Sequence, residues 1–342
     1  MEIDELCINT IRCLSMDAVQ KAKSGHPGMP MGMAPAAYIL WTKHLQHNPR
    51  NPKWVNRDRF VLSAGHGCML LYSLLYLTGY DLSLDEIKNF RQWGSKTPGH
   101  PEYGHTPGVE VTTGPLGQGI SNAVGMAIAE KYLAAYFNRD GFSVIDYRVY
   151  VVAGDGCMQE GVSSESCSLA GHLGLNNLIV IYDDNHITID GETALSFGED
   201  VAKRYEAYGW FVQTVRGDGN DMGAFERALI AAQNEKTRPS IIKLRTHIGY
   251  GSPNKQDSHD AHGSPLGEEE VALTKVRYGW DPNKKFHIPD EALRAFRSEI
   301  EKGATREQEW NVLFAKYKKI YPALAKEFER ASERKLPSEW EQ

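Results

Sequence analysis

The chain has 342 residues, of which 41% are hydrophobic and 24% charged, and a formal net charge of −6. These values are typical of a globular protein with a sizeable core, and no basic run or basic helix stripe indicates a nucleic-acid partner. No apolar run approaches the ~20 residues that span a bilayer, and the acidic N-terminus is unlike a signal or transit peptide. The five cysteines lack CxxC spacing. We therefore expect a cytoplasmic protein with free thiols.

The first predicted elements are two helices, a strand and a third helix. Apolar residues recur at helical spacing over residues 3–18, which predicts an amphipathic helix that stops at Ser24-Gly25. Glycine and proline punctuate the next segment, SGHPGMPMG, and predict a loop. We expect a second helix over residues 34–44, a strand within residues 59–66 and a buried helix directly after it.

A long segment without clear periodicity follows, over residues 91–118. It is rich in glycine, proline, histidine and threonine. A loop of this length inside a compact domain is usually functional or disordered. Its aromatic and histidine content favours a functional loop.

Four β-branched-rich runs then predict strands: YRVYVVAGD, NLIVIYDDN, FVQTVRG and PSIIKLRT. They lack strict alternation and are separated by helical stretches that include residues 120–138 and 160–174. This pattern predicts an α/β fold, with a doubly wound, mainly parallel sheet covered by helices on both faces. Residues 123–129 are all apolar or glycine, so we expect this stretch to be buried on all sides and suited to a subunit interface.

The character of the chain changes beyond Trp280. Strand signals become few, and a charged helical run extends over residues 305–335. We therefore divide the chain into a domain of residues 1–280 and a C-terminal helical linker of residues 281–342.

The most specific feature is Gly154-Asp155-Gly156 at the end of one predicted strand, with Asn185 at the end of the next. In a doubly wound sheet, ligands bind outside the carboxyl ends of the strands, so both side chains should face one crevice. Asp155 offers an anionic oxygen and Asn185 a neutral amide oxygen, which suits Mg²⁺. The alternative is an Asp-Gly turn, with Asn185 capping another strand. This alternative is weak, because the strand, the spacing and the second strand-terminal asparagine all occur together.

Gly154-Asp155-Gly156, followed by 28 residues and then Asn185, resembles the signature of thiamine-diphosphate enzymes. The surrounding segment, GDGCMQEGVSSESCSLAGHLGLNNLIVIYDDNHITIDG, is similar to the transketolase family. The resemblance implies a diphosphate-binding (PP) domain in which Asp155, Asn185 and the backbone carbonyl of Ile187 bind Mg²⁺, for which Ca²⁺ or Mn²⁺ can substitute.

The same resemblance implies further cofactor contacts. Gly156 would lie against the diphosphate, and Glu160 would join a hydrogen-bond network at a subunit interface. In the segment GPLGQG, Gly114 and Leu116 would approach the cofactor rings. The alternative is that this segment is only a glycine-rich entry to the helix expected from residue 120.

Four histidines lie in Gly/Pro-rich segments that match the family: His26, His66, His100 and His262. Cleaving a ketose beside its carbonyl requires proton transfers, for which imidazole is suited near neutral pH. By resemblance, His26 and His262 contact the substrate near the reacting carbons, His66 and His262 approach the diphosphate, and His100 binds the first hydroxyl of the substrate. The alternatives are surface or satisfied core histidines, or a zinc site, which the missing HExxH and Cys/His spacing disfavours.

The implied activity is transfer of a two-carbon glycolaldehyde (ketol) unit from a ketose phosphate to an aldose phosphate via thiamine diphosphate, in the pentose phosphate pathway, by a homodimer. The family completes its site with a pyrimidine-binding domain that these 342 residues lack. We therefore expect an enzyme part that is inactive alone, and the long linker favours a fragment over a split subunit. The alternatives are dihydroxyacetone synthase, another thiamine-diphosphate enzyme such as deoxyxylulose-phosphate synthase or a 2-oxoacid dehydrogenase subunit, or a non-catalytic interaction module.

Overall fold

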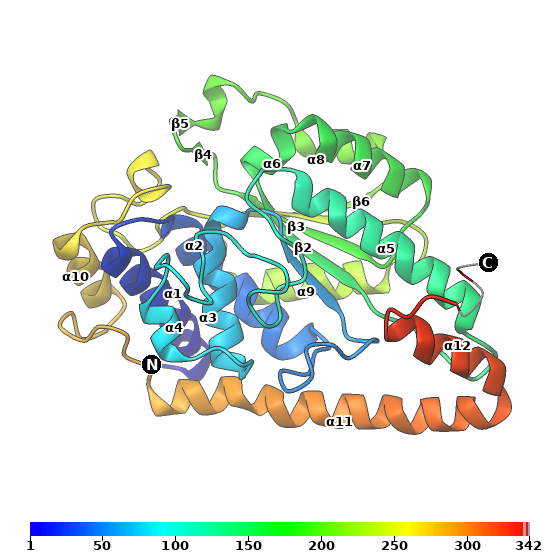
Figure 1. Ribbon diagram of the computed structural model, residues 1–342. Helices are drawn as coiled ribbons and strands as arrows, with labels where there is room; N and C mark the ends of the chain where they lie inside the picture. The colour runs from blue at the N-terminus through cyan, green and yellow to red at the C-terminus, as the bar shows by residue number, and fades with distance from the viewer. Residues whose placement is uncertain (338–339, 341–342) are drawn as a thin grey trace.

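A parallel sheet forms the centre of the computed structural model, which describes residues 1–337 and 340 (Figure 1). Within these residues its strands pair in the order β1-β2-β3-β7-β6, and every pairing is parallel. The predicted α/β class and parallel sheet are confirmed. The strands are β1 (Arg59–Leu62), β2 (Val149–Gly154), β3 (Leu178–Asp184), β6 (Phe211–Val215) and β7 (Ser240–Arg245).

Helices cover both faces of this sheet (Figure 1). One face carries α5 (Gln118–Phe137), α7 (Gly161–His172) and α8 (Val201–Ala207). The other carries α9 (Met222–Asn234), against which α2 (Gly28–Ile39) packs. The connection from β6 to β7 runs back toward β3, so a right-handed crossover places α9 on the face opposite to α8. Further helices are α1 (Ile3–Ala22), α3 (Cys68–Thr78), α4 (Leu84–Lys88), α6 (Asp155–Gln159) and α10 (Glu268–Arg277).

The two central strands define the edge of the sheet at which a ligand is expected to bind. Every residue of β2 and β3 is buried, because helices cover both faces of the sheet at these strands. Their parallel register pairs Gly154 with Asp183, so both strands end at the same edge of the sheet. The residues that follow, from Asp155 and from Asn185 onward, therefore begin side by side.

One predicted boundary is wrong. The loop expected over SGHPGMPMG ends at Gly28, where α2 (Gly28–Ile39) begins, and a π-helical turn (Leu40–His44) then completes the helix predicted for residues 34–44. Pro30 lies in the first turn, where the missing N–H of proline costs nothing. All residues of α2 are buried, so tertiary packing outweighs the local glycine and proline signals.

Within this single chain, residues 123–129 are not buried on all sides, and their place at a subunit interface stays a prediction. Ala123, Val124 and Ala127 are buried against the sheet, but Gly125 and Ala129 are exposed. Apart from its chain neighbours and the backbone of its own helix, no atom of the described residues lies within 4 Å of a Cβ placed on Gly125. The small residues of α5 therefore leave one open face of the helix.

The C-terminal helical run is confirmed and begins earlier than predicted. α11 (Asp290–Ile320) crosses below α1 and α3, and α12 (Pro322–Ser332) turns back toward α5 (Figure 1). Phe296 and Tyr317 of α11 are fully buried in the main hydrophobic core. The last residues of the predicted linker, 338–339 and 341–342, lie outside the described residues.

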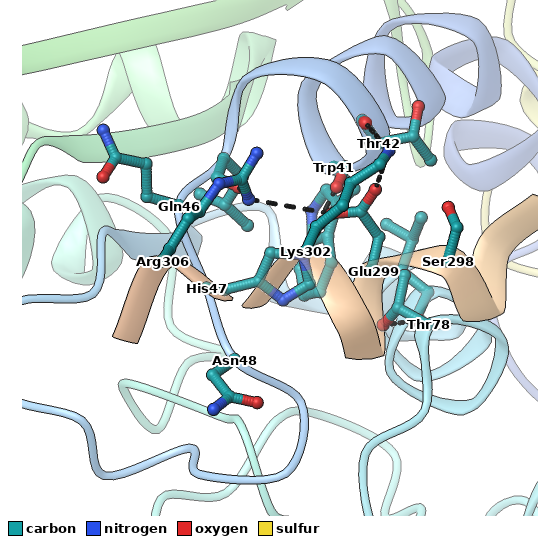
Figure 2. A network of polar contacts seen from close by, with 12 residues as sticks. Trp41, Thr42, Gln46, His47, Asn48, Thr78, Ser298, Glu299, Lys302 and Arg306 are labelled. Atoms are coloured by element: carbon teal, nitrogen blue, oxygen red, sulfur yellow. Dashed lines mark hydrogen bonds and ion pairs between the residues drawn. The ribbon is translucent and has the colours of Figure 1, made fainter. Parts of the chain in front are cut away.

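A buried polar network fixes the register of α11 (Figure 2). Glu299 is fully buried, and its Oε1 accepts a bond from Lys302 Nζ over 2.6 Å. Lys302 also donates to the carbonyl of Thr42, and Arg306 donates to the carbonyl of Leu45. Both carbonyls lie at the end of the π-helical turn, where helix carbonyls lack partners within their own helix.

A second buried ion pair joins α1 to α10. Lys275 Nζ lies 2.6 Å from Asp17 Oδ1, and both residues are at most 3% exposed. The other oxygen of Asp17 accepts from the backbone N–H of Phe286 over 2.7 Å, and Lys275 also donates to the carbonyl of Lys284 over 2.8 Å. The pair thereby holds the segment that leads into α11.

All five cysteines are buried, and none is paired in a disulfide, as predicted. Burial raises the pKa of Cys7 and Cys68 to about 12 and that of Cys167 to about 11, and it also raises the pKa of Cys13 and Cys157. Among the described residues, no helix is both long and apolar enough to cross a membrane.

Candidate active site

A cavity of about 370 Å³ opens at the carboxyl edge of β2 and β3. The ends of these two strands and several glycine-rich loops form its walls. Ten of the eleven residues predicted for the site line it: His26, His66, Gly114, Leu116, Asp155, Gly156, Glu160, Asn185, Ile187 and His262.

The three predicted metal ligands lie on the same wall. Asp155 is the first residue of α6, directly after β2, and its Oδ2 accepts from the backbone N–H of His186 over 3.1 Å. Asn185 directly follows β3, and its Oδ1 accepts from the backbone N–H of Ile187 over 2.9 Å. Asp155 and Asn185 are about 95% buried, at 4% and 5% exposure. Ile187 itself begins a short antiparallel hairpin, β4 (Ile187–Thr188) with β5 (Gly191–Glu192), that the sequence did not predict.

The electrostatics of this wall suit a cation. Burial, together with the charges of Asp183 and Asp184, raises the pKa of Asp155 to about 7, although hydrogen bonds from Tyr182 and the His186 backbone lower it. Burial likewise raises the pKa of Asp183 to about 6. A divalent cation would offset the cost of holding these carboxylates out of water.

The donor set fits Mg²⁺ better than a soft metal. Among the described residues, no group of three His, Cys, Asp or Glu side chains could hold a metal by itself. A metal at this wall would take one carboxylate, one amide and one backbone carbonyl, and complete its shell from ligand oxygens. Mg²⁺ binds in this way, with few protein ligands and phosphate oxygens.

Glycines keep the cavity open for a ligand. A Cβ on Gly156 would lie 2.7 Å from Leu116 Cδ1, and one on Gly114 would lie 3.3 Å from the ring of His100. Gly114 also has φ +151°, which few side chains adopt. Larger residues at these positions would fill the space between the loops, so the cavity requires glycine at both.

The four predicted histidines come from four separate segments and lie close together, three of them lining this cavity and His100 at its rim. The ring of His26 lies 5.1 Å from that of His66, 5.8 Å from that of His262 and 6.5 Å from that of His100. The rings of His66 and His262 stack at 5.0 Å with an angle of 17°. His100 does not line the cavity, but its ring lies against Gly114 at the rim.

These histidines are neutral near pH 7. Burial lowers the pKa of His26 to about 4, and it also lowers the pKa of His66, His100 and His262. A neutral imidazole can both donate and accept a hydrogen bond. The Nδ1 atom of His262 is buried and has no hydrogen-bond partner among the described residues, so a bound ligand could satisfy it.

The depressed histidine pKa values predict acid sensitivity. In the unfolded chain His26 binds a proton at the ordinary pKa of 6.5, whereas in the folded chain its pKa is about 4. The free energy of unfolding should therefore fall as the pH falls between these values. We expect His26→Gln to reduce the loss of unfolding free energy between pH 7 and pH 4.5, measured by urea unfolding. The exposed His172 serves as control, since His172→Gln should leave the loss unchanged. An equal loss in His26→Gln and the unaltered chain would contradict this prediction.

One residue of the site escaped the sequence analysis. Arg91 has φ +61°, its NH2 lies 3.5 Å from His26 Nδ1, and its NH1 donates to Ser24 Oγ over 2.9 Å. Its charge contributes to the lowered pKa of His26 and His100. The only signal was its place at the start of the long loop, and nothing local indicated that its side chain would reach back to His26.

Two more residues of the site were missed, Tyr182 and Asp183 of β3. Tyr182 bonds Asp155, and Asp183 bonds Asn185. The run YDD directly before Asn185 was a usable signal, because polar residues are unexpected at the end of a fully buried strand.

Comparison with known proteins gives a consistent result. Residues 3–337 match the family model described as "Transketolase, thiamine diphosphate binding domain". The chain is 58% identical over 339 residues to a transketolase of Halalkalibacterium halodurans and 58% identical over 340 residues to one of Geobacillus stearothermophilus. Each match covers 99% of this chain and 51% of the relative, so the chain spans about half the length of these relatives.

Solved structures agree with the sequence matches. A transketolase from Leishmania mexicana superposes with a TM-score of 0.97 at 51% identity, over 100% of this chain and 51% of that one. A transketolase from Pichia stipitis in complex with sedoheptulose-7-phosphate superposes with a TM-score of 0.96 at 48% identity, over 99% of this chain and 50% of that one.

Proposed function

Since this chain belongs to the transketolase family, through the thiamine diphosphate binding domain of that family, we propose that it binds the diphosphate end of the cofactor through Mg²⁺ and takes part in ketol transfer. The reaction moves a two-carbon glycolaldehyde unit from a ketose phosphate to an aldose phosphate. The observation that carries the proposal is the single cavity that joins the wall of Asp155, Asn185 and Ile187 to His26, His66 and His262.

Each wall of the cavity has its own role. Asp155, Asn185 and the carbonyl of Ile187 would hold Mg²⁺, and Ca²⁺ or Mn²⁺ could replace it. Gly156 leaves room for the diphosphate, and His66 is placed to approach it. Thiamine diphosphate, when bound, supplies the nucleophile that cleaves a ketose beside its carbonyl.

The remaining histidines would contact the sugar substrate. His26 and His262 are neutral, lie 5.8 Å apart and can exchange protons with substrate hydroxyls. His100 at the rim would bind the first hydroxyl. Gly114 and Leu116 would support the cofactor rings, and Glu160, which is exposed, would join a network with a neighbouring subunit.

The proposal includes a partner for this chain. Because the chain spans about half the length of its relatives, we propose that a pyrimidine-binding domain or subunit completes the cofactor and phosphate sites. Exposed Leu169 of α7, Leu173 directly after α7 and Tyr132 of α5 support a homodimer through the face formed by α5 and α7. Unpaired thiols support a cytoplasmic location. The division of the chain at residue 280 into a PP domain and a helical linker is also part of the proposal.

An assay of ketol transfer tests the proposal. The purified chain is supplied with Mg²⁺, thiamine diphosphate, a pentulose phosphate and a pentose phosphate, alone and with a separate chain that carries the second half of a transketolase. We expect no turnover above background from the chain alone and turnover with the added half. Substantial turnover by the chain alone would contradict the proposed need for a second half. No turnover in either case, with both chains folded, would contradict the proposed activity.

A further inference from the structure

The orientation of the Asn185 amide decides which of its atoms a metal meets. Its Nδ2 donates to Asp183 Oδ2 over 3.0 Å, and its Oδ1 accepts from the N–H of Ile187 over 2.9 Å. Turning the amide by 180° would place its NH2 group against that N–H and its oxygen against the carboxylate. Both contacts would then be repulsive, so the two neighbours fix Oδ1 on the side of Ile187.

Asp183 is itself held rigidly. It is 1% exposed, lines the cavity, and its Oδ1 accepts a hydrogen bond from the hydroxyl of Thr246, which directly follows β7. A chain of contacts therefore runs from Thr246 through Asp183 to Asn185. Because Thr246 is also buried, at 1% exposure, water does not compete for these bonds.

The preceding residue makes an equivalent contact to the other ligand. The hydroxyl of Tyr182 donates to Asp155 Oδ1 over 2.5 Å, and Tyr182 is 1% exposed. With the N–H of His186 on Oδ2, this bond fixes the plane of the Asp155 carboxylate. Two consecutive residues at the end of β3 thus each contact one of the two side chains at the proposed metal wall.

We infer that Tyr182 and Asp183 are positioning residues for the metal, Tyr182 by orienting the Asp155 carboxylate and Asp183 by presenting the amide oxygen of Asn185. The inference rests on the proposed role of Asp155 and Asn185 as ligands. Partners that orient metal ligands in this way typically change metal affinity by about 10- to 100-fold when they are removed.

The test measures metal affinity directly. Mg²⁺ is titrated calorimetrically into the full chain mixed with thiamine diphosphate, and the heat of the protein-free mixture is subtracted. The variants are Asp183→Asn, which allows the Asn185 amide to turn, and Tyr182→Phe, which removes only a hydroxyl. Asp184→Asn is the matched control, because it removes an adjacent buried charge that bonds neither ligand side chain, and Asp155→Ala tests the ligand itself.

We expect the dissociation constant of Mg²⁺ to rise about 10- to 100-fold in Asp183→Asn and in Tyr182→Phe, and by less than about threefold in Asp184→Asn. Should Asp183→Asn fail to fold, as seen by circular dichroism, Tyr182→Phe decides the question alone.

Two results would overturn the inference while leaving the proposed function intact. One is an unchanged affinity in both variants although Asp155→Ala abolishes binding. The other is an equal loss in Asp184→Asn, which would show that charge alone matters. Absence of Mg²⁺ binding by the unaltered chain, or binding that survives Asp155→Ala, would overturn both the proposed metal wall and this inference.

Discussion

Asp155→Ala is expected to abolish the rise in melting temperature that Mg²⁺ and thiamine diphosphate together produce in the unaltered chain. Asp155 is the one carboxylate among the three proposed ligands, so its removal takes away the only anionic ligand from the protein. A ligand at about 100 times its dissociation constant stabilises the folded state by about 2.7 kcal/mol, and this contribution should vanish in the variant. Thermal unfolding with cofactor, with and without Mg²⁺, measures it.

Two further variants make that result specific. Asp155→Asn keeps the size of the side chain and removes its charge, so it should lose most of the same stabilisation. Asp140→Ala changes an exposed aspartate in the turn between Arg139 and Phe142, outside the cavity, and should behave as the unaltered chain. A melting temperature that still rises fully with Mg²⁺ in Asp155→Ala would show that the metal binds elsewhere.

The second large effect is expected on stability rather than on binding. Asp17→Ala should lower the free energy of unfolding by about 3–5 kcal/mol, because it leaves a buried ammonium without its counter-charge. Lys275 is 0% exposed and, among the residues that the structure describes, would keep only the carbonyl of Lys284 as a partner. Urea unfolding followed by circular dichroism measures the change.

An exposed ion pair in the same region supplies the control. Glu268 lies 2.7 Å from Lys285, and both side chains are more than half exposed. Glu268→Ala should change the unfolding free energy by less than about 1 kcal/mol. The double variant Asp17→Ala with Lys275→Met should recover part of the stability lost in Asp17→Ala, since it leaves no buried charge. A change below about 1 kcal/mol in Asp17→Ala would contradict the assigned role of the pair.

The sheet and the meeting of Asp155 with Asn185 at its edge were predictable because their signals are local. β2 and β3 are short apolar runs, and a buried parallel strand requires such a run. Asp155 and Asn185 follow the ends of these strands, so the parallel register alone brings them to one edge. No knowledge of distant contacts was needed for this part of the site.

The start of α2 was not predictable from local signals. Gly28 is required because a Cβ there would lie 2.4 Å from the carbonyl oxygen of Ala261, a contact between segments more than 200 residues apart. Glycine next to proline predicts a loop when only the neighbouring residues are known. The close approach of the His262 loop to α2 decides the structure instead.

The misjudged face of α5 has a different cause. An apolar or glycine run predicts a buried helix, but small side chains such as Gly125 and Ala129 are tolerated on an exposed face as well. The hydrophobicity of this stretch therefore does not predict which of its residues are buried. Local signals likewise did not reveal the role of Arg91, because its partner His26 lies far away in the sequence.

The five buried cysteines make the chain convenient for site-specific labelling. A maleimide reacts with an accessible thiolate, and all five native thiols are enclosed and have a raised pKa. A cysteine introduced at a fully exposed position, such as Trp93→Cys, would then be the one site that reacts in the folded protein. A fluorophore or spin label could be attached within the long loop without removing a native cysteine first, and it would report on the approach of a second chain to this loop.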